Sequence, residues 1–235
     1  MKKLPIDIIS ANCLTPNDSL TALDYCTKFF KFNNSILFTS EAVNSSNHKV
    51  QKIEKFETLD DYSNFILRLY DYVESDHVLI IQDDGFITNP DKWTDSFLDY
   101  DYVGAPWPTS KKFIKRWDDV IYQNSVKNIK RNRVGNGGFS LRSKKFLKYA
   151  SQFKSTNKIA EDVFLCLVNY EEAMKNGIKF APFEIAHQFS SEVSFKGFRM
   201  KKEAKNKKFQ QDLHFGFHGK RFVNSEQIIK LKFPS

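Results

Sequence analysis

The chain has 235 residues and 41% hydrophobic side chains, which is enough for one large α/β domain with a sizeable core. Its formal net charge of +8 favours an anionic ligand or surface, but no nucleic-acid-binding motif accompanies that charge, so no nucleic-acid partner is expected. Neither a secretory leader nor an apolar run of about twenty residues is recognisable. The three unclustered cysteines predict buried thiols in a cytoplasmic, reducing environment.

The first eighty residues or so alternate between strand and helix patterns. Strands are expected at 6–10, 35–39 and 78–81, a more exposed strand at 50–56, and amphipathic helices at 18–30 and 59–73. This alternation predicts a mainly parallel central sheet flanked by helices and joined by right-handed crossovers.

The pattern changes after residue 90. We expect a short helix at 93–98, a strand entering a Gly/Pro turn at 100–107, helices at 146–153 and 161–175, and a strand beginning at 179–182. The helix at 161–175 should end at Asn176–Gly177. The basic segment 111–133 has little periodicity, which is typical of active-site lids and of plain surface insertions.

An acidic turn follows the apolar strand at 78–81. Asp83 and Asp84 come directly after it, and Gly85 allows the backbone to turn. Ligands bind beyond the carboxyl ends of strands in open α/β sheets, and carboxylates there can hold Mg²⁺ or Mn²⁺ with substrate phosphates. A solvated Asp-Gly turn explains the same residues, so either interpretation is open.

A second feature is the glycine-rich passage at 133–142. Gly135, Gly137 and Gly138 permit close approach of backbone N–H groups to a ligand, and the alternating residues after them predict a strand. The spacing matches neither a dinucleotide-binding fingerprint nor a P-loop. A simple bulge or turn is the alternative interpretation.

Two further groups of polar residues could carry chemistry. Glu161 and Asp162 stand at an expected helix start, where they complement the helix dipole or supply a general base and a group that binds the acceptor hydroxyl. His214 and His218 lie four residues apart, but Gly216 between them favours a loop over a helix. One of these histidines could join Asp84 on a metal, or both could be structural.

These groups, in this order, resemble the GT-A class of nucleotide-sugar-dependent glycosyltransferases, and most of all a bacterial family of such transferases. The blocks that carry the resemblance are Gln82–Gly85, Tyr100–Trp107, Gly135–Arg142, Glu161–Phe164 and Gly216–Gly219. The resemblance covers roughly residues 6–219. It implies a single GT-A-like domain over 1–235, with a Rossmann-like nucleotide half (about 1–90) and an acceptor half (about 91–235).

The resemblance also implies roles for individual residues. Asp84 and His218 would bind Mn²⁺ or Mg²⁺, Asp162 would be the catalytic base, and Glu161 would contact the acceptor. Gln82 stands where such enzymes carry the first Asp of Asp-x-Asp, which would weaken metal dependence or shift that position to a ribose contact. The donor-binding residues would be Asn12, Gln82, Asp83, Gly137, Gly138 and Arg142.

The implied activity is transfer of a sugar, with inversion, from a nucleotide-diphosphate donor to a hydroxyl of a glycan or lipid-linked acceptor. A UDP-sugar is the favoured donor, and bacterial lipopolysaccharide or capsule synthesis is the expected context. The basic stretches 111–133 and 196–208 could hold the diphosphate, an anionic acceptor or the inner membrane face. A nucleotidyltransferase and a non-catalytic carbohydrate-binding module of the same fold are the alternatives, and Gln82 keeps the second one open.

Overall fold

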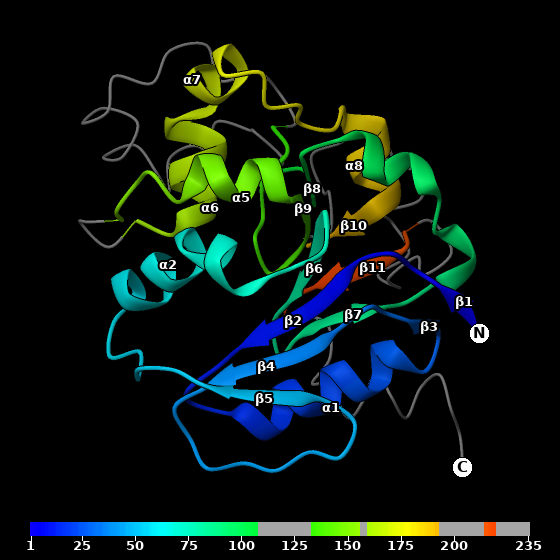
Figure 1. Cartoon of the computed structure of the whole chain (residues 1–235). Helices are drawn as coiled ribbons and strands as arrows, with labels where there is room; N and C mark the ends of the chain where they lie inside the picture. The colour runs from blue at the N-terminus through cyan, green and yellow to red at the C-terminus, as the bar shows by residue number, and fades with distance from the viewer. Residues whose placement is uncertain (108–132, 156–158, 193–213, 220–235) are drawn as a thin grey trace.

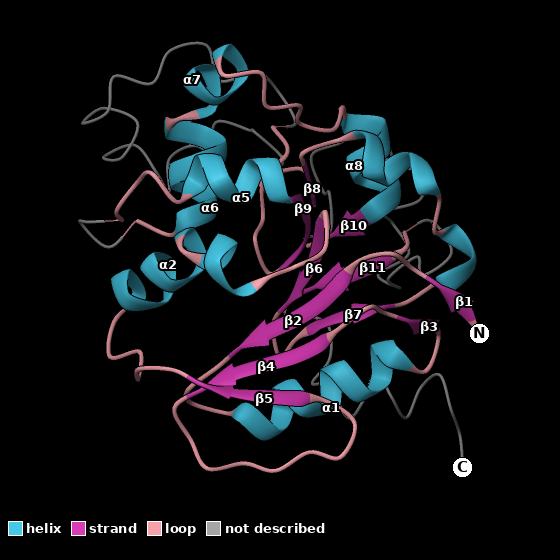
Figure 2. Ribbon diagram, in the orientation of Figure 1, coloured by secondary structure: helices cyan, strands magenta, loops and turns pink. Residues whose placement is uncertain are grey.

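A six-stranded sheet with helices on both faces organises the protein (Figures 1 and 2). The computed structural model describes residues 1–107, 133–155, 159–192 and 214–219. The strand order is β5 (Lys49–Lys52), β4 (Ser35–Thr39), β2 (Asp7–Ala11), β6 (His77–Ile81), β9 (Phe139–Ser143) and β8 (Tyr102–Gly104). The first four strands are parallel, and β9 is antiparallel to both β6 and β8. The predicted α/β class with a mainly parallel sheet is confirmed.

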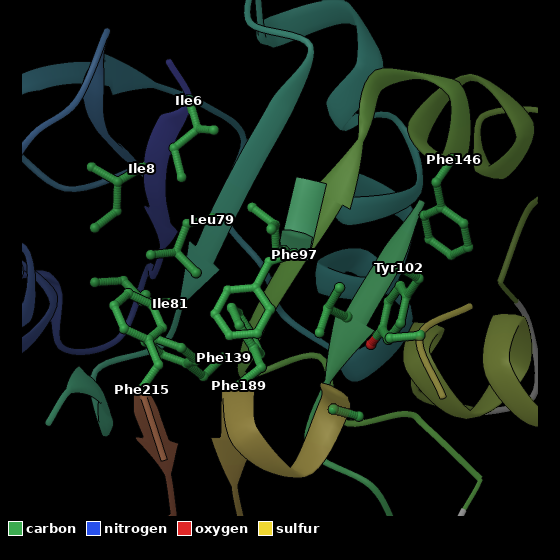
Figure 3. Close-up of a cluster of buried hydrophobic side chains, with 14 of the residues drawn as sticks. Ile6, Ile8, Leu79, Ile81, Phe97, Tyr102, Phe139, Phe146, Phe189 and Phe215 are labelled. Carbon is green, nitrogen blue, oxygen red and sulfur yellow. The ribbon is translucent and has the colours of Figure 1, made fainter. Parts of the chain in front are cut away.

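Strand alternation divides the core into two layers. Ile9, Ile36 and Ile80 pack with side chains of α2 (Leu59–Leu67), of the 3₁₀ turn η1 (Leu69–Tyr72) and of α5 (Lys144–Ala150). Their chain neighbours point to the opposite face because successive side chains of a strand alternate. On that face Ile8, Leu37 and Leu79 pack in a second cluster with α1 (Pro16–Thr27), as Figure 3 shows for Ile8 and Leu79.

Aromatic side chains dominate part of the second cluster. Phe139 of β9 lies 5.3 Å from Phe189 and 6.0 Å from Phe215 between ring centroids, and Phe97 lies 5.2 Å from Phe189 (Figure 3). Centroid separations of about 4.5–7 Å are those that aromatic pairs prefer. The cluster therefore ties the central sheet to residues near the C-terminal end of the described chain.

A smaller three-stranded sheet adjoins the central one. It contains β10 (Ser190–Ser191), β11 (Gly216–His218) and β7 (Gly85–Ile87), in that order, with β11 antiparallel to β7 (Figure 1). The loop expected around Gly216 is wrong, because these residues form a strand. No helical or strand period is visible in three residues, so only the pairing with β7 could reveal it. A short parallel pair, β1 (Lys2–Lys3) and β3 (Phe30–Lys31), lies at the N-terminal end.

Several predicted helices are present but interrupted. The pattern at 59–73 is α2 followed by η1. The pattern at 161–175 is α6 (Glu161–Val163), a π-helical turn η5 (Phe164–Val168) and α7 (Tyr170–Lys175), and it ends as predicted at Gly177 with φ +75°. The helix expected at 93–98 is instead the 3₁₀ turn η3 (Asp95–Asp99), and another such turn, η2 (Pro90–Lys92), precedes it. Periodicity located these segments and missed the change in helix type.

The strand expected at 179–182 is wrong. Phe180 makes one isolated parallel bridge to Tyr102, and α8 (Phe183–Phe189) begins directly after Pro182. Pro182 lacks a backbone N–H and cannot extend a ladder of hydrogen bonds, which explains the short pairing.

Other expectations concern residues that the structure leaves out in part or in full. The basic stretch 196–208 and all of 111–133 except Arg133 lie outside the described residues. Cys13, Cys26 and Cys166 are buried and form no disulfide, as expected. No helix in the described ranges has the length and apolar character needed to cross a membrane.

We expect Gly216→Ala to destabilise the fold through the contact between β11 and β9. A Cβ at residue 216 would lie 2.1 Å from the Phe139 ring, which is itself fully buried. Overpacking of this kind costs roughly 1–3 kcal/mol, measurable as a lower free energy of unfolding in urea. Gly177→Asn is the control: a Cβ there would lie 3.6 Å from Lys145 Nζ, an ordinary van der Waals contact, and Asn tolerates positive φ, so a comparable loss in that variant would contradict the steric explanation.

Candidate active site

Two neighbouring parallel strands end side by side and begin the site. β2 ends at Ala11 and β6 at Ile81, and the segments after them meet where the Thr15 hydroxyl donates to Asp83 Oδ2 at 3.4 Å. The Asn12 side chain makes four hydrogen bonds within its own loop, to the backbone N–H groups of 14 and 15 and to the hydroxyls of 15 and 19. Asn12 therefore shapes the loop, and its contact with a donor stays a prediction.

The acidic turn after β6 is not a solvated loop. Gly85 N–H donates to the Gln82 carbonyl at 2.9 Å and closes the turn, and Gln82 N–H donates to the Gly138 carbonyl at 2.8 Å. The Asp84 side chain is only 14% exposed, and its Oδ1 lies 3.1 Å from His218 Nε2. Burial against a histidine makes an ordinary Asp-Gly turn the weaker interpretation of these residues.

His218 is brought to this turn by strand pairing. In the β7–β11 ladder His218 stands opposite Gly85, the residue after Asp84. Its Nε2 lies 2.9 Å from Gln82 Oε1, and its Nδ1 lies 3.2 Å from Asn136 Nδ2. Burial alone would lower the pKa of His218, but the hydrogen bond and negative charge of Asp84 more than offset it, so the pKa is raised.

The glycine-rich passage lies directly beneath these side chains. A Cβ on Gly138 would lie 2.1 Å from His218 Nε2, and one on Gly137 would lie 2.5 Å from Glu161 Oε1. Gly137 N–H donates to Asp162 Oδ2 at 2.8 Å. The glycines let β9 begin in contact with both the histidine and the acidic pair, as close backbone approach requires.

The carboxyl group of Asp162 has a raised pKa. Removal from water raises its pKa to about 6, the charge of Glu161 adds to the increase, and the Gly137 hydrogen bond opposes it. A carboxylate with a pKa near neutrality can both be ionised and accept a proton at physiological pH. The Ala160–Val163 helix start holds it at the wall of a cavity.

Glu161, the neighbour of Asp162, is instead held in a buried ion pair. Arg142 Nη2 lies 2.7 Å from Glu161 Oε1, and the two side chains are 1% and 5% exposed. Arg142 is buried and pairs with Glu161 in the structure, and its contact with a donor stays a prediction. Side chains alternate along β9, and that of Arg142 lies on the inner side, where it neutralises Glu161. Its Cζ lies 5.2 Å from the centroid of the Tyr102 ring.

A cavity of about 270 Å³ has both His218 and Asp162 on its lining, while Asp84 and Arg142 lie outside that lining. It is lined by Leu59, Tyr62, Gln82, Asn136, Gly137, Gly138, Ala160, Glu161, Asp162, Glu192 and His218. The sequence analysis missed Tyr62, Asn136 and Glu192. In the sequence, Tyr62 has the spacing of a core residue in an amphipathic helix, and Glu192 belongs to no motif. Asn136 could have been noticed only because it lies between two glycines.

The donor atoms suit a divalent cation held jointly with a ligand. No group of three His, Cys, Asp or Glu that could hold a metal occurs in the described ranges. Asp84, His218 and the Gln82 amide oxygen nevertheless converge, and His218 Nε2 faces both oxygens. Tyr62 fixes the Gln82 amide because its hydroxyl accepts from Gln82 Nε2 at 3.0 Å, which turns the oxygen toward His218. Oxygen and imidazole donors suit Mn²⁺ or Mg²⁺, with phosphate oxygens completing the shell.

The chain matches one protein family over most of its length. The family is described as "Protein of unknown function (DUF5672)", and the match covers residues 45–218. The chain belongs to this family. The DUF5672 match includes the acidic turn, the glycine-rich passage, the Glu161–Asp162 pair and His218. No curated protein matches the sequence.

Solved structures show what fold this DUF5672 protein has. The galactosyltransferase LgtC, in complex with donor and acceptor sugar analogs, has a TM-score of 0.56 at 12% identity, with 98% of this chain and 97% of that chain covered. A glycosyltransferase involved in glycosylation of the major capsid of PBCV-1 has a TM-score of 0.51 at 11% identity, with 97% and 99% covered. The fold is that of the GT-A glycosyltransferases.

We expect Arg142→Met to destabilise the protein, because it leaves the Glu161 carboxylate buried without a counter-charge. Removing one partner of such a pair costs about 3–5 kcal/mol, and adding Glu161→Gln should recover most of that loss in urea unfolding. Lys2→Met is the control, since its pair with Asp95 is exposed and such pairs contribute at most about 1 kcal/mol. Additive losses in the Arg142/Glu161 double variant would contradict a coupled pair.

Proposed function

We propose that this protein is a glycosyltransferase that moves a sugar from a nucleotide-diphosphate donor, with a UDP-sugar favoured, to an acceptor hydroxyl. The observation that carries the proposal is the convergence of two sites on one cavity at the carboxyl edge of the sheet. Asp84 and His218 provide a cation site on one side, and Asp162 provides a base on the other. The similarity in fold to glycosyltransferases supports it.

The cation-binding residues would act on the leaving group. Asp84, His218 and Gln82 would hold Mn²⁺ or Mg²⁺, which when bound supplies positive charge to stabilise the departing diphosphate. Without a cation the same residues give this region little positive charge of their own. The loop after β2 and Asp83 lie at the same edge of the sheet, where a nucleotide would extend away from the cavity.

The cavity would take the transferred sugar. Cavities for drug-sized ligands occupy roughly 300–1,000 Å³, so a volume of about 270 Å³ suits one sugar ring and not a whole nucleotide sugar. Gly137 and Gly138 line the cavity, and a Cβ at either position would collide with another lining side chain, Glu161 or His218. Glu192 adds an acceptor of hydrogen bonds for sugar hydroxyls on the lining.

Asp162 would accept the proton from the attacking hydroxyl. The Gly137 N–H and the Val163 N–H each hold one oxygen of its carboxylate, at 2.8 and 2.7 Å, and so fix its orientation. Attack opposite to the leaving group would invert the anomeric centre. The motif resemblance supports inversion, a glycan or lipid-linked acceptor and a role in bacterial surface polysaccharide synthesis, and the basic stretches of the sequence support a cytoplasmic location at the inner membrane face.

We expect Asp162→Asn to reduce sugar transfer by about 10²–10⁴-fold while donor binding is retained, because the variant keeps the shape of the base and loses its proton affinity. The measurement is product formation over a panel of sugar nucleotides with Mn²⁺. In the wild-type enzyme the rate should rise with pH around a midpoint near 6, since the base must be ionised to act.

Two results would contradict this assignment. Near-normal turnover in Asp162→Asn would show that another group takes the proton. Weakened donor binding in proportion to the lost rate would show that Asp162 holds the donor. The anomeric configuration of the product, read by NMR, tests inversion separately from the identity of the base.

Metal affinity should respond in opposite directions to two charge changes. Asp84→Asn removes a carboxylate from the site and should abolish the Mn²⁺-enhanced binding of UDP in calorimetry. Gln82→Glu adds a carboxylate on a side chain of the same length and should tighten Mn²⁺ binding about tenfold, because affinity follows the number of charged ligands. Asp83→Asn removes an equal charge from the adjacent residue and serves as the control for Mn²⁺ binding without nucleotide. Equal losses in Asp83→Asn and Asp84→Asn would contradict a specific cation site.

A further inference from the structure

Asn136 has a backbone conformation that most residues avoid. Its φ is +52°, in the left-handed region, and no other non-glycine residue in the described ranges has positive φ. Asn adopts this conformation more readily than other side-chain-bearing residues. The Tyr102 hydroxyl donates to its carbonyl at 3.1 Å, and a Cβ on Gly104 would lie 2.6 Å from the same oxygen. The backbone is therefore fixed, and rotation of the side-chain amide is the remaining freedom.

The amide of Asn136 is only half satisfied. Its Nδ2 lies 3.2 Å from His218 Nδ1, while its Oδ1 is buried without a hydrogen-bond partner among the described residues. The residue is 4% exposed and lines the cavity. A buried amide with one unpartnered atom is unusual, because most buried polar side-chain atoms are paired.

The contacts of His218 define which ring nitrogen carries the proton. Nε2 lies 3.1 Å from Asp84 Oδ1 and 2.9 Å from Gln82 Oε1, so it must be a donor in this arrangement. Nδ1 faces the Asn136 NH₂ group and is then the acceptor. With the amide in this orientation, a neutral His218 ring carries its hydrogen on Nε2.

A cation bound beside Asp84 and Gln82 requires the opposite tautomer. Nε2 would then offer its lone pair to the cation, and the hydrogen would sit on Nδ1, facing a donor NH₂ group. Rotating the Asn136 amide by half a turn replaces that NH₂ with Oδ1, the atom that has no partner at present. Metal-binding histidines generally donate their other N–H to such an acceptor, which fixes the ring.

We propose that Asn136 is a positioning residue whose amide turns over when a cation binds, so that its oxygen holds His218 in the metal-binding tautomer. This inference rests on the proposed function, because it requires that Asp84 and His218 bind a cation. In the turned state Nδ2 takes the buried position that Oδ1 holds in the structure.

The test compares Asn136→Gly with Asn136→Asp. Glycine accepts positive φ without strain, so Asn136→Gly should keep the thermal stability of the wild type. It should nevertheless weaken Mn²⁺ binding by about 10–100-fold, the usual effect of losing an outer partner of a metal-binding histidine. Asn136→Asp retains an acceptor facing Nδ1 and should restore Mn²⁺ affinity to at least the wild-type value.

Two further measurements separate positioning from a general effect on structure. In the His218→Gln background, Asn136→Gly should cause no additional loss of Mn²⁺ affinity, because the two residues act through one ring. Long-range ¹⁵N–¹H spectra of the His218 imidazole should show hydrogen on Nε2 in the metal-free protein and on Nδ1 with diamagnetic Mg²⁺ bound.

The outcomes distinguish this inference from the proposed function. Wild-type Mn²⁺ affinity in Asn136→Gly, or one unchanged His218 tautomer in both states, would overturn the role of Asn136 and leave the transferase intact. A wild-type protein that binds no divalent cation, with or without UDP, would overturn the cation site and the role of Asn136 together. Sugar transfer without a divalent cation would retain the transferase and reject both metal assignments.

Discussion

The pairing of β7 with β11 is the constraint on which the candidate site depends. It places His218 opposite Gly85, and so beside Asp84 and Gln82, although the histidine and Gln82 lie 136 positions apart in the chain. A three-residue strand has little stability of its own. The aromatic cluster around Phe215 and Phe139 supplies the packing that a short ladder lacks, and this explains why so much phenylalanine lies behind a polar site.

The glycine-rich passage joins the two chemical parts of the site. Gly138 lies against the His218 ring, and the N–H of Gly137 holds Asp162. Because these backbone contacts leave no room for a Cβ, the separation between cation site and base is determined by main-chain geometry. Side-chain rotation then contributes little to that separation. Such rigidity is what a site needs when one group must stabilise a leaving group and another must take the proton of the attacking hydroxyl.

Buried charge beneath the cavity has a structural and an electrostatic effect. Arg142 forms a buried ion pair with Glu161, at the cost of removing both side chains from water. The charge of Glu161 in turn raises the pKa of Asp162. The adjacent acids thus have different surroundings, because Arg142 of β9 pairs with Glu161 and the backbone N–H of Gly137, just before β9, donates to Asp162.

The sequence by itself determined the alternating elements of the first eighty residues, the parallel part of the sheet, and the polar residues at the ends of β2 and β6. These features follow from local hydrophobic period and from the rule that parallel strands end at one edge. Only the tertiary structure decided that the residues around Gly216 form a strand, that Arg142 faces inward and that Asn136 contacts His218. Each of these three features depends on contacts with residues distant in the chain. No local sequence pattern shows which distant residues a short segment will contact.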